Sequence, residues 1–236
     1  MRRAESTLRY LTTVLGFVAA KGHSARVPRK NMRDFSGAPL FHRILSVLSA
    51  AKSVDTVVLD SDSDEILTSA AAAFPDLVLI ERPAHLVGDD VAMNLLIGNA
   101  FEVTGATQML QTHATNPLLR PKTVDAAVAA FAADADVTSL MSVTTWQTRL
   151  YWENLEPINH NPDELLPTQE LPLVYEENSN IYIFEREAFE AAGHRVTPQC
   201  LPFPMDPLEA TDIDNEPDFV LALALDSHFN NTNSNS

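Results

Sequence analysis

Hydrophobic residues in this chain gather in short runs, and longer segments with helical periodicity separate them. The run VLGFVAA at Val14–Ala20 is apolar at almost every position, which is typical of a strand buried on both faces. The same kind of pattern predicts further strands at Val54–Leu59, Leu77–Ile80, Gln108–His113, Val137–Val143 and Val174–Phe184.

The segments between these runs carry apolar residues at the spacing of one helical face. They predict helices at Leu40–Lys52, Glu65–Phe74, Val91–Val103, Pro121–Asp134 and Phe219–Leu225. We expect Asp89 or Asp90 to cap the helix that starts near Val91. Strands that alternate with helices indicate an α/β fold, a mostly parallel, Rossmann-like sheet with helices on both faces. A ligand would then bind beyond the carboxyl ends of the strands.

Three segments fall outside this alternation. Residues 1–13 are expected to be a leader, and residues 226–236, which end in NNTNSNS, a disordered tail. Residues 146–172 hold both tryptophans and four prolines, which predicts either a cover over the active site or a subunit contact. The remaining ranges, 14–145 and 173–225, would form one domain.

The amino-acid composition limits the size of the fold and the kinds of molecule that the chain would bind. A chain of 236 residues with 45% hydrophobic content fits one domain with an appendage. Its formal net charge of -16 argues against general binding to nucleic acid or to anionic membranes. Cys200 is the single cysteine, so no intrachain disulfide can form and a cytoplasmic location is expected. No run approaches the ~20 apolar residues of a membrane span.

The loop after the first strand is the strongest candidate for a binding site. The segment KGHSARVPRK places Lys21, Arg26, Arg29 and Lys30 close to Gly22 in an otherwise acidic chain. Cations and main-chain N–H groups beside a glycine suit a polyphosphate. On composition alone, a basic surface loop is the favoured interpretation.

Two further positions carry candidate chemistry. Asp212 and Asp214, in TDID, would point to the same side of an extended segment and suit Mg²⁺ with few protein ligands. The alternative is an exposed acidic turn that caps the last helix, with Asp218 also available as a cap. His113, at the end of a strand, is either a general base for an attacking hydroxyl or a packing residue.

Five motifs, in order from about Val14 to Leu225, resemble those of the acylneuraminate cytidylyltransferases. AAKGHSARVPRKN is similar to ARGGSKRIPxKN, ERPAHLVGDD to RPxxLAxDxA, and TNPLLRP to QPTSPLR. QELPLVYEENSNIYIF is similar to RQxLPxxYxxNGAIYIF, and TDIDNEPDF to xDIDTxxDF. The resemblance implies a nucleotidyltransferase that couples CTP to a nonulosonic, sialic-type acid with the help of Mg²⁺ and releases pyrophosphate. It also implies that residues 146–172 are a dimerisation extension of a homodimer.

The resemblance assigns roles by position in the motifs. Lys21, Lys30 and Asp214 would be catalytic, and Asp212 and Asp214 would hold the metal. The nucleotide would contact Lys21, Gly22, Ser24, Arg26, Lys30, Asn31, Arg82 and Asp90. The sugar would contact His113, Thr115, Asn116, Gln169, Tyr175 and Asn178.

The motifs also depart from the family pattern. Lys21 replaces an arginine and so lacks the bidentate fork, and Ala25 replaces a lysine whose charge Arg26 or Arg29 could supply. Thr168 stands where the family has an arginine on its acidic-sugar side. These departures leave open another NTP, another acidic sugar, or a non-catalytic homologue that binds nucleotide.

Overall fold

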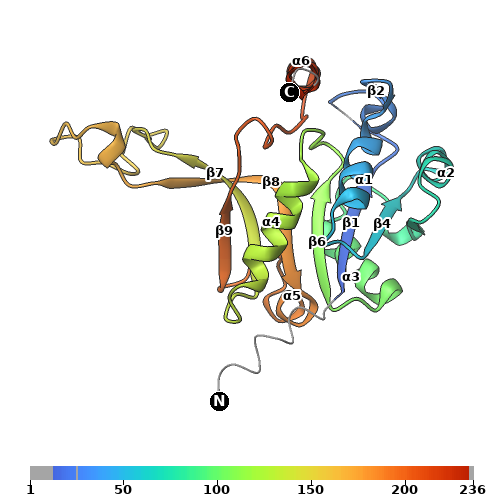
Figure 1. Cartoon of the computed structure of the whole chain (residues 1–236). Helices are drawn as coiled ribbons and strands as arrows, with labels where there is room; N and C mark the ends of the chain where they lie inside the picture. The colour runs from blue at the N-terminus through green and yellow to red at the C-terminus, as the bar shows by residue number, and fades with distance from the viewer. Residues whose placement is uncertain (1–12, 25, 234–236) are drawn as a thin grey trace.

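A seven-stranded sheet forms the centre of the computed structural model, which describes residues 13–24 and 26–233 (Figure 1). The strands lie in the order β5-β4-β1-β6-β8-β7-β9. β8 pairs antiparallel with β6 and β7, whereas the other neighbouring pairs are parallel, so the predicted mostly parallel sheet is confirmed. The strand bounds are β1 Val14–Ala20, β4 Thr56–Ser61, β5 Val78–Glu81, β6 Gln108–His113, β7 Ser139–Trp146, β8 Val174–Glu185 and β9 Cys200–Pro204.

Helices cover both faces of the sheet, which makes a Rossmann-like sandwich of three layers. On one face, α1 (Leu40–Ala50), α2 (Asp64–Ala73) and α4 (Pro121–Ala132) share a core with alternate residues of β1. On the other, α3 (Met93–Thr104) and α5 (Arg186–Ala192) share a second core with the remaining residues of β1. β1 is apolar throughout because each of its faces meets a different core.

Some local predictions were wrong. α3 begins at Met93 with Ala92 as its N-cap and without a capping side chain, so neither Asp89 nor Asp90 caps it. The sequence pattern also missed β9 and the hairpin of β2 (Asp34–Phe35) and β3 (Ala38–Pro39). β9 contains two prolines, which a sheet tolerates at its edge, and β9 lies at an edge.

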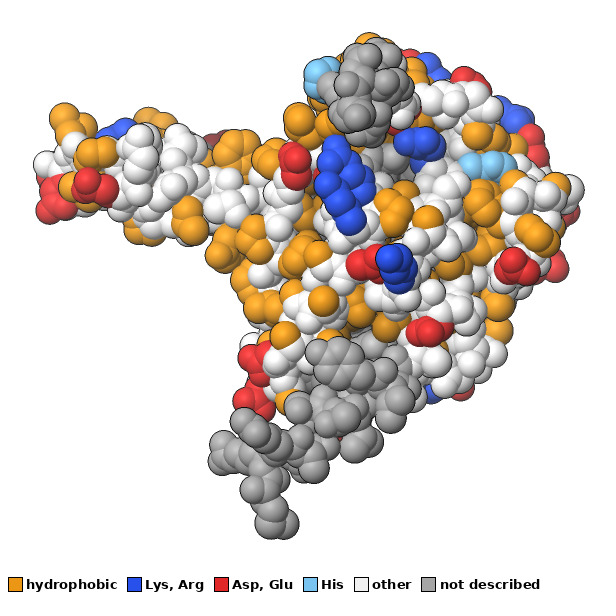
Figure 2. Space-filling view, in the orientation of Figure 1, with side chains coloured by type: hydrophobic (Ala, Val, Ile, Leu, Met, Phe, Trp, Pro, Cys, Tyr) orange, Lys and Arg blue, Asp and Glu red, His pale blue; other side chains and the backbone are white. Residues whose placement is uncertain are grey.

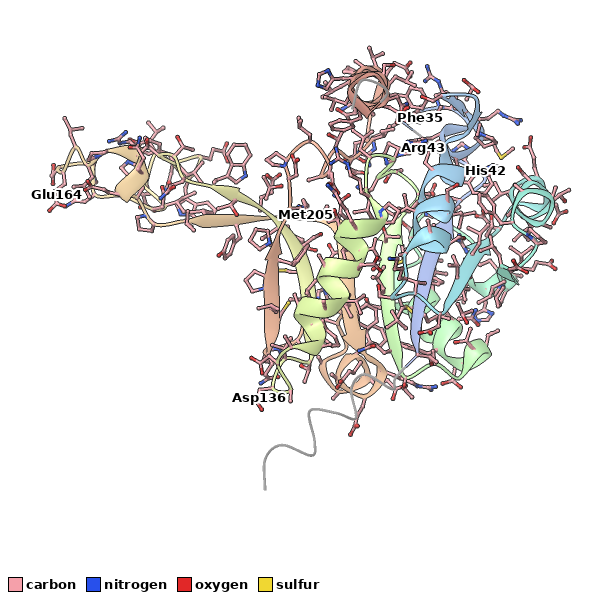
Figure 3. The ribbon with its side chains drawn as sticks, in the orientation of Figure 1. Phe35, His42, Arg43, Asp136, Glu164 and Met205 are labelled. Atoms are coloured by element: carbon pink, nitrogen blue, oxygen red, sulfur yellow. The ribbon has the colours of Figure 1, made fainter. Side chains whose placement is uncertain are left out.

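The expected disordered tail is largely helical. α6 runs from Glu216 to Asn233, well beyond the predicted end at Leu225. Its Phe219 and Ala222 are buried in a third core with Phe35 and Leu40, and its buried Asp226 pairs with Arg43 at 2.7 Å. Figure 3 labels Phe35 and Arg43 beside this helix. Residues 1–12 of the expected leader and the last three residues lie outside the described range.

Residues 147–173 form an arm that projects sideways from the sheet between β7 and β8 (Figure 1). Asn159 ties the arm together, because its Oδ1 accepts a hydrogen bond from Leu150 N and its Nδ2 donates to Thr148 O and Pro172 O. Hydrophobic side chains are exposed along the arm (Figure 2), with Leu165 at 89% exposure. The arm is therefore an ordered projection with an apolar surface.

Within the described part of the chain, we find no helix with both the length and the apolar character that a bilayer crossing requires.

Candidate active site

A cleft of about 310 Å³ opens beyond the carboxyl ends of β1 and β6, where the strand order reverses around β1. This is the place where open parallel sheets bind their ligands. The walls come mainly from the turn after β1, from the loops after β5 and β6, and from the start of α3. They include Lys21, His23, Ser24, Arg26, Lys30, Asn31, Arg82, Asp89, His113 and Thr115.

Close packing fixes the start of the turn at Gly22. Its N–H donates a hydrogen bond to Asp62 Oδ1 at 2.7 Å, and an added Cβ would lie 2.8 Å from the Cβ of Ser63. Ser63 is the N-cap of α2 and accepts a hydrogen bond from Ile66 N. Glycine is therefore required for the approach of the turn to α2, and this tight contact sets the position of the cleft wall.

The substitution Gly22→Ala is expected to raise the KM for the nucleotide that the sequence motifs imply about tenfold to 100-fold, because the cationic turn must move away from α2. Steady-state kinetics with a varied nucleotide concentration would measure this. Gly98→Ala in α3 is the matched control, since an added Cβ there meets nothing within 4 Å. Equal KM values for Gly22→Ala and the unaltered protein would contradict the assigned role.

Three of the four cations of the turn line the cleft. Lys21 Nζ lies 3.1 Å from Gly88 O and 3.3 Å from Asp89 Oδ1, and Arg26 pairs with Asp214 at 2.7 Å. Arg29 instead pairs with Glu65 of α2 at 2.5 Å and is not among the lining residues, so the expectation that it adds charge to the site was wrong. Ala25, the other departure in this turn, lies outside the described residues.

Buried polar groups hold the turn and the β5 loop in place. Asn31 Nδ2 donates to Lys21 O at 2.8 Å, and its buried Oδ1 has no partner among the described residues. Arg82 Nε donates to Asp60 Oδ1 at 2.6 Å within the core. Burial raises the pKa of Asp60, and the hydrogen bond from Arg82 opposes this shift. Arg82 Nη2, also buried and without a described partner, leaves a donor at the cleft wall.

The predicted acidic pair lies against the same turn. Ile213 is fully buried in the third core, so Asp212 and Asp214 flank a fixed point of the backbone. Lys30 Nζ donates to the backbone oxygen of Ile213 at 2.5 Å. Burial lowers the pKa of Lys30, and the charges of both aspartates oppose that shift. The cations after β1 and the carboxylates near the C-terminus therefore meet at one site, as the sequence predicted.

The chemistry of this pair fits a divalent cation with few protein ligands. Burial raises the pKa of Asp212, Asp214 adds to this shift, and a hydrogen bond from Thr115 and the charge of Lys30 oppose it. Asn116, also buried, donates to Asp212 Oδ1 at 3.4 Å. The described residues contain no cluster of three or more metal-ligating side chains, and Mg²⁺ needs only one or two carboxylates when substrate phosphates complete its shell.

Several predicted contacts do not reach the cleft. Asp90 is exposed and does not line it, whereas its neighbour Asp89 does. Gln169 lies on η4 (Thr168–Glu170) in the arm. Tyr175 is 46% exposed and pairs with Thr145 where β8 enters the arm. Asn178 accepts a hydrogen bond from Ser142 at 2.6 Å, beside the irregularity between β7 and β8.

A hydrogen-bonded chain sets the tautomer of His113. Arg195 Nη1 donates to Gln111 Oε1 at 2.7 Å, so the amide of Gln111 presents its Nε2 to His113 Nε2 at 3.0 Å. His113 Nε2 is then the acceptor and its proton lies on Nδ1. Burial, with the charges of Arg195 and Lys30, lowers the pKa of His113 to about 4. The ring is therefore neutral near pH 7 and a poor general base, and it offers an N–H donor instead.

The sequence pattern did not indicate three residues that lie near His113, at the β6 end of the cleft. Gln111 and Tyr182 face each other across β6 and β8, and Arg195 covers the ring of Tyr182. The alternation in NSNIYIF could have indicated Tyr182 as an inward position. Arg195 has no sequence signal, because it reaches the site only through the loop after α5.

A Rossmann-like sheet with a cationic cleft at its switch point, and with a carboxylate pair in contact with those cations, is typical of the nucleotidyltransferase class. The sequence profile of the cytidylyltransferase family matches residues 15–199, and the chain belongs to this family.

The chain is also similar to individual known proteins. A pseudaminic acid cytidylyltransferase of Campylobacter jejuni is 32% identical over 110 residues, 44% of this chain and 47% of the relative, so the chain spans about half the length of that relative. Post-translational flagellin modification protein B of Campylobacter coli is 23% identical over 222 residues, 89% of this chain and 94% of the relative. A solved CMP:2-keto-3-deoxy-manno-octonic acid synthetase complexed with CTP has the same fold, with a TM-score of 0.68 at 10% identity over 92% of this chain and 99% of that one.

Proposed function

We propose that this protein transfers the cytidylyl group of CTP to the anomeric hydroxyl of a nonulosonic-type acidic sugar and releases pyrophosphate. The observation that carries the proposal is the contact of Lys30 Nζ with Ile213 O between Asp212 and Asp214. It brings a cation that lines the cleft together with the two carboxylates that would bind the metal. The family assignment and the names of the relatives supply the nucleotide and the class of acceptor.

The residues of the nucleotide half would bind and orient CTP. Lys21, Arg26 and Lys30 offset the charge of the triphosphate, and Ser24 and the free donor of Arg82 add hydrogen bonds. The acceptor hydroxyl oxygen bonds to the α-phosphorus while the bond from that phosphorus to the bridging oxygen breaks. Pyrophosphate leaves with the bridging oxygen, and the hydroxyl proton is lost to solvent.

Asp212 and Asp214 would hold a magnesium ion. Two observations support this fit. The Oδ1 of Asn116, beside Asp212, is buried and has no partner among the described residues, and the two carboxylates lie on either side of the buried Ile213. The bound ion would withdraw charge from the phosphates during the displacement. Asn116 and Thr115 would keep the carboxylate of Asp212 in place.

The acceptor would be a sugar acid of the kind that the relatives' names print. These names include pseudaminic acid and, for a relative from Maricaulis maris that is 24% identical over 203 residues, 3-deoxy-manno-octulosonate. A sialic acid is a third member of the same chemical class. The donor N–H of His113 and the hydroxyl of Thr115 would face the acceptor.

We also propose a cytoplasmic homodimer, joined through the arm. The arm exposes Trp152 at 61% and Leu165 at 89%, which is more apolar surface than an isolated projection would keep in water. No residue of the arm is among the described residues that line the cleft, which favours a subunit contact over a cover for the chain's own site.

A pyrophosphate-release assay tests the proposed function. The full chain would be incubated with Mg²⁺ and each of the four NTPs, crossed with pseudaminic acid, N-acetylneuraminate and 3-deoxy-manno-octulosonate. We expect release with CTP and at least one acid and, with the other NTPs, rates lower by about 100-fold or more. Binding of CTP in calorimetry without turnover of any acid would contradict the proposal and favour a non-catalytic homologue.

A further inference from the structure

A polar cluster around one arginine lies next to the cleft and is not explained by binding of the nucleotide. It consists of Arg195 with Gln111, Tyr182 and Glu177, and we call it the Arg195 cluster. The Arg195 guanidinium stacks on the ring of Tyr182 with its Cζ 3.6 Å from the ring centroid. Its Nη1 donates to Gln111 at 2.7 Å, and its side chain is only 16% exposed. The guanidinium is therefore held rigidly.

The charge of Arg195 is only loosely balanced by the protein. The carboxylate that pairs with it, on Glu177, lies 3.8 Å away on a side chain that is 45% exposed. The same carboxylate already accepts a hydrogen bond from the hydroxyl of Tyr182. A largely buried cation is normally paired closely, because removal of a charge from water is costly. The Arg195 cluster thus has capacity for a further anion.

The cluster adjoins the cleft through the contact of Gln111 with His113, which lines the cleft, on the side away from the proposed nucleotide. Gln111 lies two residues before His113 on β6, so both point to the same face of the sheet. Tyr182 faces Gln111 on the next strand, β8. The nucleotide half, with Arg82 and Asp89, lies on the opposite side of β1, toward β4 and β5. An acceptor bound at His113 would therefore extend toward Arg195.

We propose that Arg195 is a specificity-determining residue that binds the carboxylate of the acceptor acid. This inference rests on the proposed function, which requires an acceptor with a carboxylate next to its anomeric carbon. A guanidinium can bind a carboxylate with two parallel hydrogen bonds, and stacking on Tyr182 fixes its plane in advance. Gln111 would orient both Arg195 and His113. One amide side chain would thus position the residue that binds the carboxylate and the residue that donates a hydrogen bond to the sugar.

Kinetics with an acid and its neutral ester test this assignment. The full chain, with saturating CTP and Mg²⁺, would be given the turned-over acid among the three above and its C1 methyl ester. The variants are Arg195→Met and Arg195→Lys. Arg186→Met is the control, because Arg186 pairs with Glu102 and Glu190 at the far end of the sheet.

We expect the unaltered protein to prefer the acid over the ester in kcat/KM by about 30-fold to 100-fold, which lies within the range for hydrogen bonds to charged groups. Arg195→Met should raise the KM for the acid by a similar factor, leave the KM for CTP within twofold, and leave the ester unaffected. Arg195→Lys should retain part of the preference, and Arg186→Met all of it.

Three results would overturn the inference. They are an equal loss for acid and ester in Arg195→Met, a change in the KM for CTP alone, or an unaltered protein that uses acid and ester equally well. The last comparison needs no variant, so it holds even if Arg195→Met fails to fold. Absence of turnover with every acid would instead refute the proposed function itself, and the carboxylate anchor with it.

Discussion

The substitution Asp212→Asn is expected to lower kcat by about 100-fold to 1,000-fold, the largest single effect that we predict. The carboxylate of Asp212 is half-buried beside Asp214, receives hydrogen bonds from Thr115 and Asn116, and faces the charge of Lys30. Asparagine keeps the shape and part of the hydrogen bonding but removes the charge that would hold a divalent cation. The rest of the site should keep its structure, so the KM for the sugar should change little.

Pyrophosphate release over a range of Mg²⁺ concentrations would measure this effect. The concentration of Mg²⁺ for half-maximal rate should rise for Asp212→Asn. Asp136→Asn is the matched control, because Asp136 is exposed at the opposite end of the sheet (Figure 3). A kcat within threefold of the unaltered protein would show that Asp212 does not take part in the reaction.

The substitution Lys30→Met is expected to lower kcat/KM for CTP by about 100-fold. Lys30 is the cation that contacts the backbone between the two aspartates, and burial already lowers its pKa. Methionine keeps most of the length of the side chain but loses the charge. The triphosphate would then face Asp212 and Asp214 with less opposing charge, so both the KM and the transition state should suffer.

Lys30→Arg should be milder than Lys30→Met, because it retains the charge. Lys52→Met provides the comparison for a lysine that is exposed after α1, at the amino end of β4. All four proteins would be compared at saturating acceptor with varied CTP. If Lys30→Met and Lys52→Met gave the same kinetics, Lys30 would have no role in binding the triphosphate.

The sequence predicted best those elements whose burial is visible as a run of apolar residues within the element itself. β1 is apolar on both faces because the sheet is covered twice, and β6 matches its predicted bounds. α6 was predicted too short because the partners of Asp226 are Arg43 and Ser36, about 190 residues earlier in the chain. A polar composition resembles disorder until such partners are known.

The site residues divide in the same way, into those that a short segment reveals and those that only long-range contacts reveal. The cationic turn and the TDID pair are short segments, and each carries its chemistry in a few adjacent residues. Tyr175 lies outside the cleft because β8 is long and its first residues adjoin the arm, which a motif alone does not reveal. Arg195 was missed because its partners lie on β6 and β8, and only the tertiary structure brings them together.

The central claim is that the turn after β1 and the pair of Asp212 and Asp214 enclose one triphosphate. A crystal structure of the full chain with CTP and Mn²⁺ as an anomalous scatterer tests it most directly. The claim predicts a manganese peak bound to both aspartates and phosphate oxygens in contact with Lys21 and Lys30. A manganese peak away from this pair, or a triphosphate bound on the β8 side of the cleft at Arg195, would contradict it.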